Sequence, residues 1–199
     1  MTRTRQDAND RPRPQSTRCP WANGSEAMIA YHDQEWGIPL HDDRRLFEML
    51  TLEGAQAGLS WRTILQRREG YRETYHGFDI ARVAAMTDAD LEQAMQNAGI
   101  IRNRLKVWSV RTNAGAALRA MEKHGSLDAY LWSLVPNAPI VNRWRSSDQV
   151  PARTAASDAM RKQLAKDGFS FVGSTICYAF MQATGMVNDH LTSCFRSRK

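Results

Sequence analysis

Hydrophobic residues recur mainly at three- and four-residue spacings from Arg18 onward, which is the periodicity of helices with one buried face. No segment shows the strong apolar–polar alternation of a half-buried strand. Capping residues and glycines indicate where the helices begin and end. We expect helices at about residues 42–57, 61–75, 88–98, 103–122, 127–134 and 157–167.

Individual residues support these boundaries. Asp42 or Asp43 can cap the first helix and Ser60 the second, because their side chains can accept hydrogen bonds from the free N–H groups of a first turn. Thr87 begins a segment that resembles a capping box, and Gly99 is expected to end the helix that follows. The pattern predicts an all-α fold.

Two segments depart from simple helical amphipathicity. Residues 135–153 hold three of the seven prolines, which is typical of a long loop. Residues 168–188 carry no charged side chain but several polar ones. This run is too polar for lipid, so we expect a helix buried in the middle of the domain.

The length of 199 residues suggests one domain with a sizeable core. Residues 1–17 are polar and rich in arginine, and we predict a disordered basic tail there, followed by a single helical domain over 18–199. The chain has neither an apolar stretch that could span a membrane nor the apolar segment of a secretory signal. Its three cysteines are too few for a disulfide framework, which favours a reducing cytoplasm.

Positive charge is concentrated in part of the chain. The net charge is +6, yet residues 93–121 contain no acidic residue and five basic ones. Such a segment suits a polyanion, although a solvated helix face is an equally good explanation of this feature alone. The cations are Arg102, Arg104, Lys106, Arg111 and Arg119.

Two cysteines and two histidines lie at the ends of the predicted domain. Cys19 and His32 are near its start, whereas His190 and Cys194 are four residues apart near its end, a spacing that would share one face of a helix. Together they could form a tetrahedral Zn²⁺ site without an open position, which would be structural. Ordinary thiols and a hydrogen-bonded histidine are the alternative.

One carboxylate falls on an apolar helix face. Leu46, Leu50 and Ala57 share that face, and Glu53 lies on it, whereas Glu48 lies well off it. A carboxylate facing a core must be paired, hydrogen-bonded or protonated. A structural salt bridge would satisfy it.

Aromatic neighbours allow a second interpretation of Glu53. Trp61 follows in the sequence, and Tyr31 and Trp21 lie in the segment that a zinc site would hold. Aromatic faces attract cations, so this set could bind a flat, positively charged ligand.

Several segments together resemble the type I 3-methyladenine DNA glycosylases. The resemblance covers residues 18–195 and leaves the basic tail outside. It is carried by CPW (19–21), AYHD (30–33), EWG (35–37), LEGAQAGLSW (52–61), AGIIRNR (98–104), FVGSTICY (171–178) and VNDH (187–190).

The resemblance implies a fold of the helix-hairpin-helix glycosylase superfamily with one structural zinc ion. It implies metal ligands at Cys19, His32, His190 and Cys194. It implies a base pocket with Glu53 as the catalytic and base-binding residue, together with Tyr31, Trp61 and Trp21. It implies a DNA-binding hairpin with contacts at Gly99, Ile100, Ile101, Arg102 and Arg104.

The hairpin departs from the usual superfamily pattern. Gly99 is present, but Ile101 stands where a second glycine is expected. The chain offers no convincing match to the catalytic aspartate of the superfamily, and Asn103 lies near the position of its lyase lysine. Strand cleavage through a Schiff base is therefore not supported.

The resemblance implies a cytoplasmic, monomeric DNA-repair hydrolase. It would flip a nucleotide out of double-stranded DNA and hydrolyse the N-glycosidic bond of 3-methyladenine, with 3-methylguanine as a second candidate substrate. A non-enzymatic, zinc-stabilised DNA-binding module would share the basic segment and the metal, but not the inward carboxylate. A zinc hydrolase would need an open coordination position.

Overall fold

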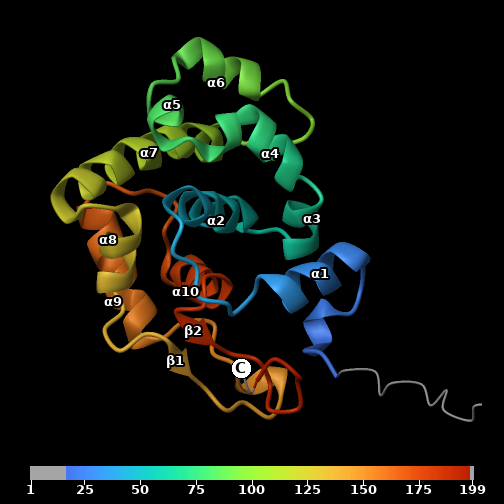
Figure 1. Ribbon diagram of the computed structural model, residues 1–199. Coiled ribbons are helices and arrows are strands. Elements are labelled where there is room, and N and C mark those ends of the chain that lie inside the picture. The colour runs from blue at the N-terminus through green and yellow to red at the C-terminus, as the bar shows by residue number, and fades with distance from the viewer. Residues whose placement is uncertain (1–16, 198–199) are drawn as a thin grey trace, which may run out of the picture.

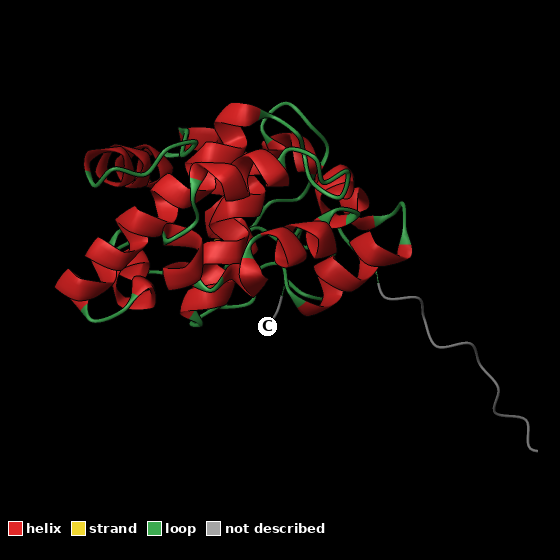
Figure 2. Cartoon of the chain, turned by 90° about the horizontal axis from the view of Figure 1, so that it is seen from above, coloured by secondary structure: helices red, strands yellow, loops and turns green. Residues whose placement is uncertain are grey.

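The computed structural model describes residues 17–197, and ten α-helices make up most of this part of the chain (Figures 1 and 2). The helix α2 lies at the centre, with α7 and α10 packed on two sides of it (Figure 1). The helices are α1 (Glu26–Gln34), α2 (Asp43–Gln56), α3 (Trp61–Leu65), α4 (Arg68–Thr74), α5 (Ile80–Ala84), α6 (Asp88–Ala94), α7 (Arg104–His124), α8 (Leu127–Ser133), α9 (Ala155–Lys166) and α10 (Ser174–Ala183). Short 3₁₀ turns occur at η1 (Pro20–Ala22), η2 (His76–Phe78) and η3 (Ser147–Gln149).

The central helix α2 is buried on all sides. Every residue from Leu46 to Ala55 is buried, so both faces of the helix contact other elements. Glu48 and Glu53 lie within this buried stretch. The sequence pattern correctly predicts that Glu53 is buried. Glu48 lies off the predicted apolar face and is buried as well, because other elements cover more than one face of α2.

Local capping determines several boundaries as predicted. The side chain of Asp42 accepts from the backbone N–H of Arg45 at the start of α2, and Asn103 caps α7 in the same way. Thr87 begins α6 with a complete capping box. The helix α7 ends at Gly125, whose φ of +89° suits glycine.

The predicted helix over residues 61–75 is wrong, because the chain forms the separate helices α3 and α4. The break at Gln66 and Arg67 turns α4 so that Arg68 donates to Glu35 (2.8 Å) and Glu48 (2.7 Å). The break between α3 and α4 thus allows Arg68 to form ion pairs with residues that are distant in the sequence.

Gly99 does not end a helix as predicted, since α6 already ends at Ala94. Gly99 instead lies against Gly70 of α4, where a Cβ atom added to Gly70 would be 2.4 Å from the carbonyl oxygen of Gly99. The two glycines allow α4 and the segment before α7 to approach with their backbones in contact.

The observed fold is mostly helical, but it also contains a two-stranded parallel sheet that the expected all-α fold lacks. The strands β1 (Ile140–Val141) and β2 (Val187–Asn188) pair with Ile140 opposite Val187. β1 and η3 lie within the predicted long loop, while α10 and β2 occupy parts of the uncharged run. The sheet joins the long loop to the C-terminal segment.

The C-terminal segment after β2 forms turns, so the helix expected to carry His190 and Cys194 is absent. Its backbone meets the start of the described chain, where Phe195 N–H donates to the carbonyl of Thr17 (3.0 Å). The basic tail predicted at residues 1–17 falls almost wholly outside the described residues. Within residues 17–197, every helix is too short or too polar to cross a bilayer.

Candidate active site and metal centre

A cavity of about 720 Å³ opens between α1, α2, α3 and α10. It is walled by aromatic rings and by a few polar side chains, a composition typical of small-molecule sites. All four of the predicted pocket residues line it. These and the other lining residues used below are Trp21, Tyr31, Glu53, Trp61, Ser147, Val150, Gln182 and Asp189.

Glu53 presents a buried carboxyl group to this cavity without a compensating partner. Its side chain is 3% exposed, and its Oε2 atom has no hydrogen-bond donor in the described part of the chain. Burial raises the pKa of Glu53 to about 8. The salt bridge considered from the sequence is therefore absent.

Glu48, one and a half turns earlier in α2, has the opposite environment. It accepts hydrogen bonds from Arg68 (2.7 Å) and Arg72 (2.8 Å). Burial opposes its ionisation, but these two guanidinium groups outweigh burial and lower the pKa of Glu48. The same helix thus carries one satisfied and one unsatisfied carboxyl group.

The aromatic residues form a continuous wall beside Glu53. The ring centroids of Tyr31 and Trp61 lie 5.1 Å apart, and those of Trp21 and Tyr31 lie 6.3 Å apart. Burial, together with the charge of Glu53, raises the pKa of Tyr31, so its phenol stays neutral. The indole Nε1 of Trp61 is buried without an acceptor in the described residues.

Two residues that line the cavity therefore carry buried, unpartnered polar atoms, an acceptor on Glu53 and a donor on Trp61. An unsatisfied buried polar atom costs about 1–3 kcal/mol, which a ligand with matching groups would recover. The arrangement suits a flat ligand that is aromatic, cationic and able to donate hydrogen bonds.

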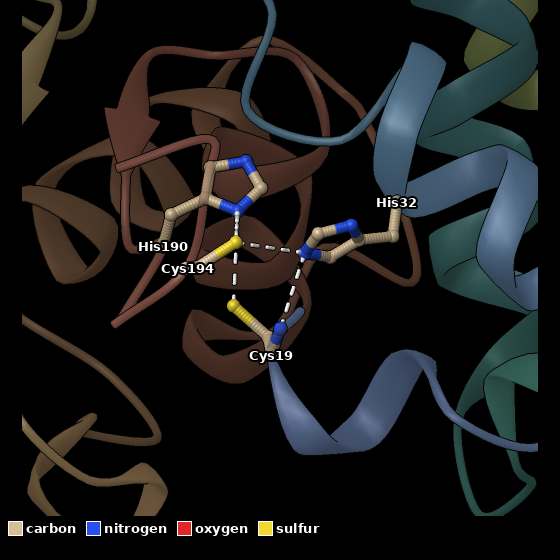
Figure 3. Close-up of side chains that lie close together, drawn as sticks. All are labelled: Cys19, His32, His190 and Cys194. Atoms are coloured by element: carbon tan, nitrogen blue, oxygen red, sulfur yellow. Dashed lines mark hydrogen bonds between the residues drawn. The ribbon is translucent and has the colours of Figure 1, made fainter. Parts of the chain in front are cut away.

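Cys19, His32, His190 and Cys194 meet in one buried cluster, as Figure 3 shows. Their four potential ligand atoms all lie within 4.8 Å of one another. Cys194 Sγ is 3.4 Å from His32 Nε2 and 3.5 Å from His190 Nδ1, while Cys19 Sγ is 3.7 Å from His190 Nδ1. The sequence prediction that these residues converge is confirmed.

The cluster has the dimensions of a tetrahedral zinc site. Zn–S bonds of about 2.3 Å and Zn–N bonds of about 2.0–2.1 Å place sulfur and nitrogen ligands about 3.5 Å apart at a tetrahedral angle. The three S···N distances of 3.4–3.7 Å bracket that value. The donor set and its spacing therefore fit a metal ion.

Outer hydrogen bonds orient both imidazoles towards the centre. His32 Nδ1 lies 2.7 Å from an Asp33 carboxylate oxygen, and His190 Nε2 lies 3.1 Å from the Trp36 carbonyl oxygen. Each outer nitrogen can donate its proton there, which leaves the inner nitrogen as a lone-pair donor.

Burial shifts the pKa values of two of these groups in opposite directions. Burial lowers the pKa of His190 to about 4, so this imidazole is neutral at pH 7. Burial raises the pKa of Cys19 to about 12, so its thiolate needs a neighbouring cation to form.

Asp189 forms a polar hub that sequence analysis missed. It is 2% exposed and accepts from Tyr178 (2.6 Å), Gln182 (2.7 Å), Asn142 (2.7 Å) and Trp144 (2.8 Å). It is the first charged residue after the uncharged run 168–188 and stands next to the predicted ligand His190. That position could have marked it as buried and functional.

The segment 98–104 forms the turn between α6 and α7. The backbone N–H groups of Gly99, Ile100 and Ile101 already donate within the protein, to Asn97 Oδ1 (2.7 Å), Asn97 O (3.4 Å) and Tyr71 OH (3.2 Å). These groups are therefore occupied in the structure.

The backbone N–H groups that remain without an acceptor at this turn belong to the residues after Ile101. The N–H groups of Arg102, Arg104 and Leu105 find no acceptor in the described chain, and all three side chains are exposed. The guanidinium of Arg104 pairs with Glu92 and stacks on Trp108, its Cζ lying 3.9 Å from the ring centroid.

Lys106 faces away from the cavity. Its Nζ donates to the carbonyls of Ala55 (2.9 Å) and Ala57 (2.7 Å), the last carbonyls of α2. Lys106 therefore joins α7 to the C-terminal end of the helix that carries Glu53. Within residues 17–197, no lysine lines the cavity.

Comparison with known proteins gives consistent matches over nearly the whole chain. A family model described as methyladenine glycosylase matches residues 21–197. DNA-3-methyladenine glycosylase 1 of Escherichia coli (strain K12) is 50% identical over 178 residues, which are 89% of this chain and 95% of that protein.

Solved structures match equally well. A crystal structure of a 3-methyladenine DNA glycosylase I has a TM-score of 0.86 at 53% identity, covering 90% of this chain and 98% of that one. A variant of a 3-methyladenine DNA glycosylase I in complex with 3-methyladenine has a TM-score of 0.88 at 31% identity, covering 92% and 98%.

Proposed function

The chain belongs to the methyladenine glycosylase family, and we propose that it hydrolyses the N-glycosidic bond of 3-methyladenine in alkylated double-stranded DNA. One observation carries the proposal: the unpartnered, buried carboxyl group of Glu53 beside the rings of Tyr31 and Trp61. Methylation at N3 gives the adenine ring a positive charge, which an unmodified base lacks. Glu53 would distinguish the two.

Recognition requires the damaged nucleotide to leave the base stack, at a cost of a few kcal/mol. The extruded base would stack on Trp61, near Tyr31 and Trp21. Glu53 would then accept hydrogen bonds from the base and lie next to its positive charge. A cation beside Glu53 favours the carboxylate, so binding of the charged base would release the proton that burial retains.

The reaction itself needs little assistance. As the C1′–N9 bond breaks, its electron pair neutralises the cationic ring, so the base leaves without protonation by an acid. The oxygen of a water molecule bonds to C1′, and that water loses a proton. We infer that Glu53 serves mainly in base recognition and also stabilises the positive charge that develops on the sugar.

We infer that the Cys/His cluster binds one Zn²⁺ ion through Cys19, His32, His190 and Cys194. Four protein ligands fill a tetrahedral coordination sphere, so this ion would supply structural stability rather than an activated water molecule. It would hold the segment before α1 against the segment after β2. Trp21, which packs edge-on to His32 at 5.3 Å between ring centroids, would be positioned by the same centre.

We further propose that the fold belongs to the helix-hairpin-helix glycosylase superfamily and that residues 98–104 are its DNA-binding hairpin. Because Gly99, Ile100 and Ile101 use their N–H groups internally, phosphate binding there would depend on the guanidinium of Arg102, and on that of Arg104 once it leaves Glu92. The free N–H groups at the start of α7 would assist, as helix N-termini bind anions well. These groups carry no sequence information, which suits an enzyme that searches for damage.

Schiff-base chemistry would need a lysine amine at the sugar, and the engagement of Lys106 with the end of α2 supports a purely hydrolytic enzyme. We propose that the protein acts as a cytoplasmic monomer. Its buried free cysteines suit a reducing compartment.

The substitution Glu53→Gln tests the recognition role. We expect the affinity for free 3-methyladenine in its protonated, cationic form, measured at mildly acidic pH, to fall by about 10–100-fold, the value of one charge-assisted hydrogen bond. Single-turnover excision at saturating enzyme should slow by a smaller factor. Asp158→Asn removes an exposed carboxylate from α9 and serves as the control, with both constants unchanged.

The measurement combines calorimetric binding of free base with chromatography of bases released from methylated DNA. Unchanged affinity with a collapsed excision rate would reassign Glu53 to the chemical step. Failure of the wild-type protein to release any base would leave the non-enzymatic DNA-binding module as the function.

A further inference from the structure

The loop between β1 and α9 places three arginines beside the cavity. We call residues 142–153 the arginine loop, after Arg143, Arg145 and Arg153. Ser147 and Val150 of this loop line the cavity itself. The loop is thus part of the wall around the substrate, although it lies outside the acid-free segment 93–121.

The side chains at the start of this loop alternate between half-buried and exposed positions. Asn142 and Trp144 point inward and donate to the same oxygen of Asp189, at 2.7 Å and 2.8 Å. Arg143 and Arg145 occupy the intervening positions and are exposed, as is Arg153. Because Asp189 holds Asn142 and Trp144 inward, the side chains of Arg143 and Arg145 between and after them face outward.

The three guanidiniums have no protein partner in the described chain. Among residues 17–197 no ion pair or hydrogen bond involves these guanidiniums, and Arg145 donates only through its backbone N–H, to Gln149 Oε1 (2.8 Å). Other exposed arginines, such as Arg44 and Arg104, pair with Asp79 and Glu92. Unpaired arginines on a well-anchored loop are available for an external anion.

The anchoring of the loop is firm. Thr192 N–H donates to the carbonyl of Trp144 (2.8 Å), and both Trp144 and Val150 pack against the apolar cluster around Cys19 and Cys194. The backbone that carries the exposed arginines is therefore packed against the Cys/His cluster. Because this backbone is already ordered, binding of a ligand would cost it little conformational entropy.

We propose that Arg143, Arg145 and Arg153 form a second DNA-binding surface, which holds backbone phosphates next to the extruded nucleotide. The inference rests on the proposed function, because extrusion of a base into the cavity brings the DNA backbone to its mouth. In Figure 1 the arginine loop runs below β1 and β2, whereas the turn between α6 and α7 lies at the upper right, with α1 and α3 between them. The DNA would be held on both sides of the damaged nucleotide.

Salt dependence gives a direct measure of such contacts. Each phosphate contact contributes about 0.9 to the slope of log K against log salt concentration. Replacing the three arginines with glutamine should therefore reduce that slope by about 2–3 for a duplex with one stable abasic-site analogue. The affinity for free 3-methyladenine should not change, since none of the three side chains lines the cavity.

A matched control removes the same charge elsewhere. Arg161, Lys162 and Lys166 are exposed cations of α9, and their replacement with glutamine also lowers the net charge by three. We expect this variant to keep the wild-type slope. An equal loss of slope in both triple variants would show a general charge effect and overturn the proposal.

Neutral methylphosphonates in place of the phosphates that flank the lesion provide a second readout. On this DNA the wild type and the arginine-loop variant should bind with equal affinity, because the contact is absent in both. The proposal would be overturned if the two proteins still differed in affinity for this DNA, or if the salt slope on normal DNA were unchanged in the variant. Neither result would count against the glycosylase function, which excision by the wild type would still support. Loss of the proposed function would instead appear as no base released by the wild type.

Discussion

Glu48 and Glu53 show how the surroundings of a side chain decide what it can do. Both are buried glutamates of α2, five positions apart. Two arginines lower the pKa of Glu48, whereas burial without a cation raises that of Glu53. The protein thus leaves Glu53 without a cation, as the proposed binding of a cationic base requires.

The raised pKa of Glu53 has a consequence for stability in the absence of substrate. Its pKa is 4.5 in an ordinary environment and about 8 in the folded protein. Between these two pH values the folded state keeps a proton that the unfolded state has released, so stability falls as pH rises. Each pH unit changes the free energy of unfolding by at most about 1.4 kcal/mol.

The substitution Glu53→Gln should remove this dependence. Between pH 6 and pH 8 we expect the wild type to lose about 1–3 kcal/mol of unfolding free energy relative to the variant. Urea unfolding of the free protein at pH 6, 7 and 8 measures it, with Asp158→Asn as a control that shows no such trend. A constant difference would mean that Glu53 is ionised in the empty cavity.

At the scale of elements, close packing of backbones positions the turn between α6 and α7. Gly70 and Gly99 touch, and Ile101 N–H donates to Tyr71 of the same helix α4. Contacts with α4 therefore help to hold the proposed DNA-binding hairpin in place.

The substitution Gly70→Ala tests this contact. A methyl group there would lie 2.4 Å from the Gly99 carbonyl oxygen, so backbone must move. We expect a loss of about 2–4 kcal/mol of stability and weaker DNA binding, while binding of free 3-methyladenine is retained. Urea unfolding and duplex binding measure the two effects.

Gly115→Ala in α7 is the matched control, because a methyl group there meets only the end of Arg119 at 3.6 Å. Alanine is the better helix former, so this variant should be neutral or more stable by about 0.5–1 kcal/mol. Equal stability of the two variants would contradict the close backbone packing.

Elements determined by local interactions could be predicted from the sequence. The start of α2 at Asp42 and of α7 at Asn103 follows from caps within three residues. The break between α3 and α4 and the role of Gly99 could not be predicted. They depend on contacts with residues 20–33 positions away, such as Glu48 and Gly70.

The same division holds for the candidate site. Glu53 follows from helix periodicity, and the four cluster residues follow from their side-chain chemistry. The position of Asp189 after the uncharged run indicates burial, but its partners, Gln182 among them, could not be predicted, because a carboxylate is tolerable in the core only with donors from several elements. Those donors come from α10 and from the loop after β1, which no local pattern brings together.

At the scale of the whole molecule, the Cys/His cluster connects the two ends of the described chain. Cys19 and Cys194 are separated by most of the sequence, and their side chains share one buried centre (Figure 3). Cavity residues lie next to that centre, since Trp21 packs on His32 and Asp189 precedes His190. Stability of the metal site and shape of the cavity should therefore be linked.

Removal of one ligand by Cys194→Ser measures how much this connection contributes. A link that closes so long a loop is worth about 5 kcal/mol, which corresponds to a fall in Tm of about 10–20 °C for a protein of this size. We expect the variant to lose the single zinc ion that native mass spectrometry should detect in the wild type. Cys177→Ala alters a buried cysteine outside the cluster and should keep the zinc, with a much smaller fall in Tm.

Excision by Cys194→Ser separates structural from catalytic zinc. An ion bound as proposed, with all four coordination positions filled by protein, would have no place for a reacting water molecule, so the variant should still release 3-methyladenine at temperatures well below its own Tm. If the variant stays folded and binds free base but releases none from DNA, the ion takes part in the reaction. If it keeps one zinc ion and the wild-type Tm, the Cys/His cluster is not the metal site.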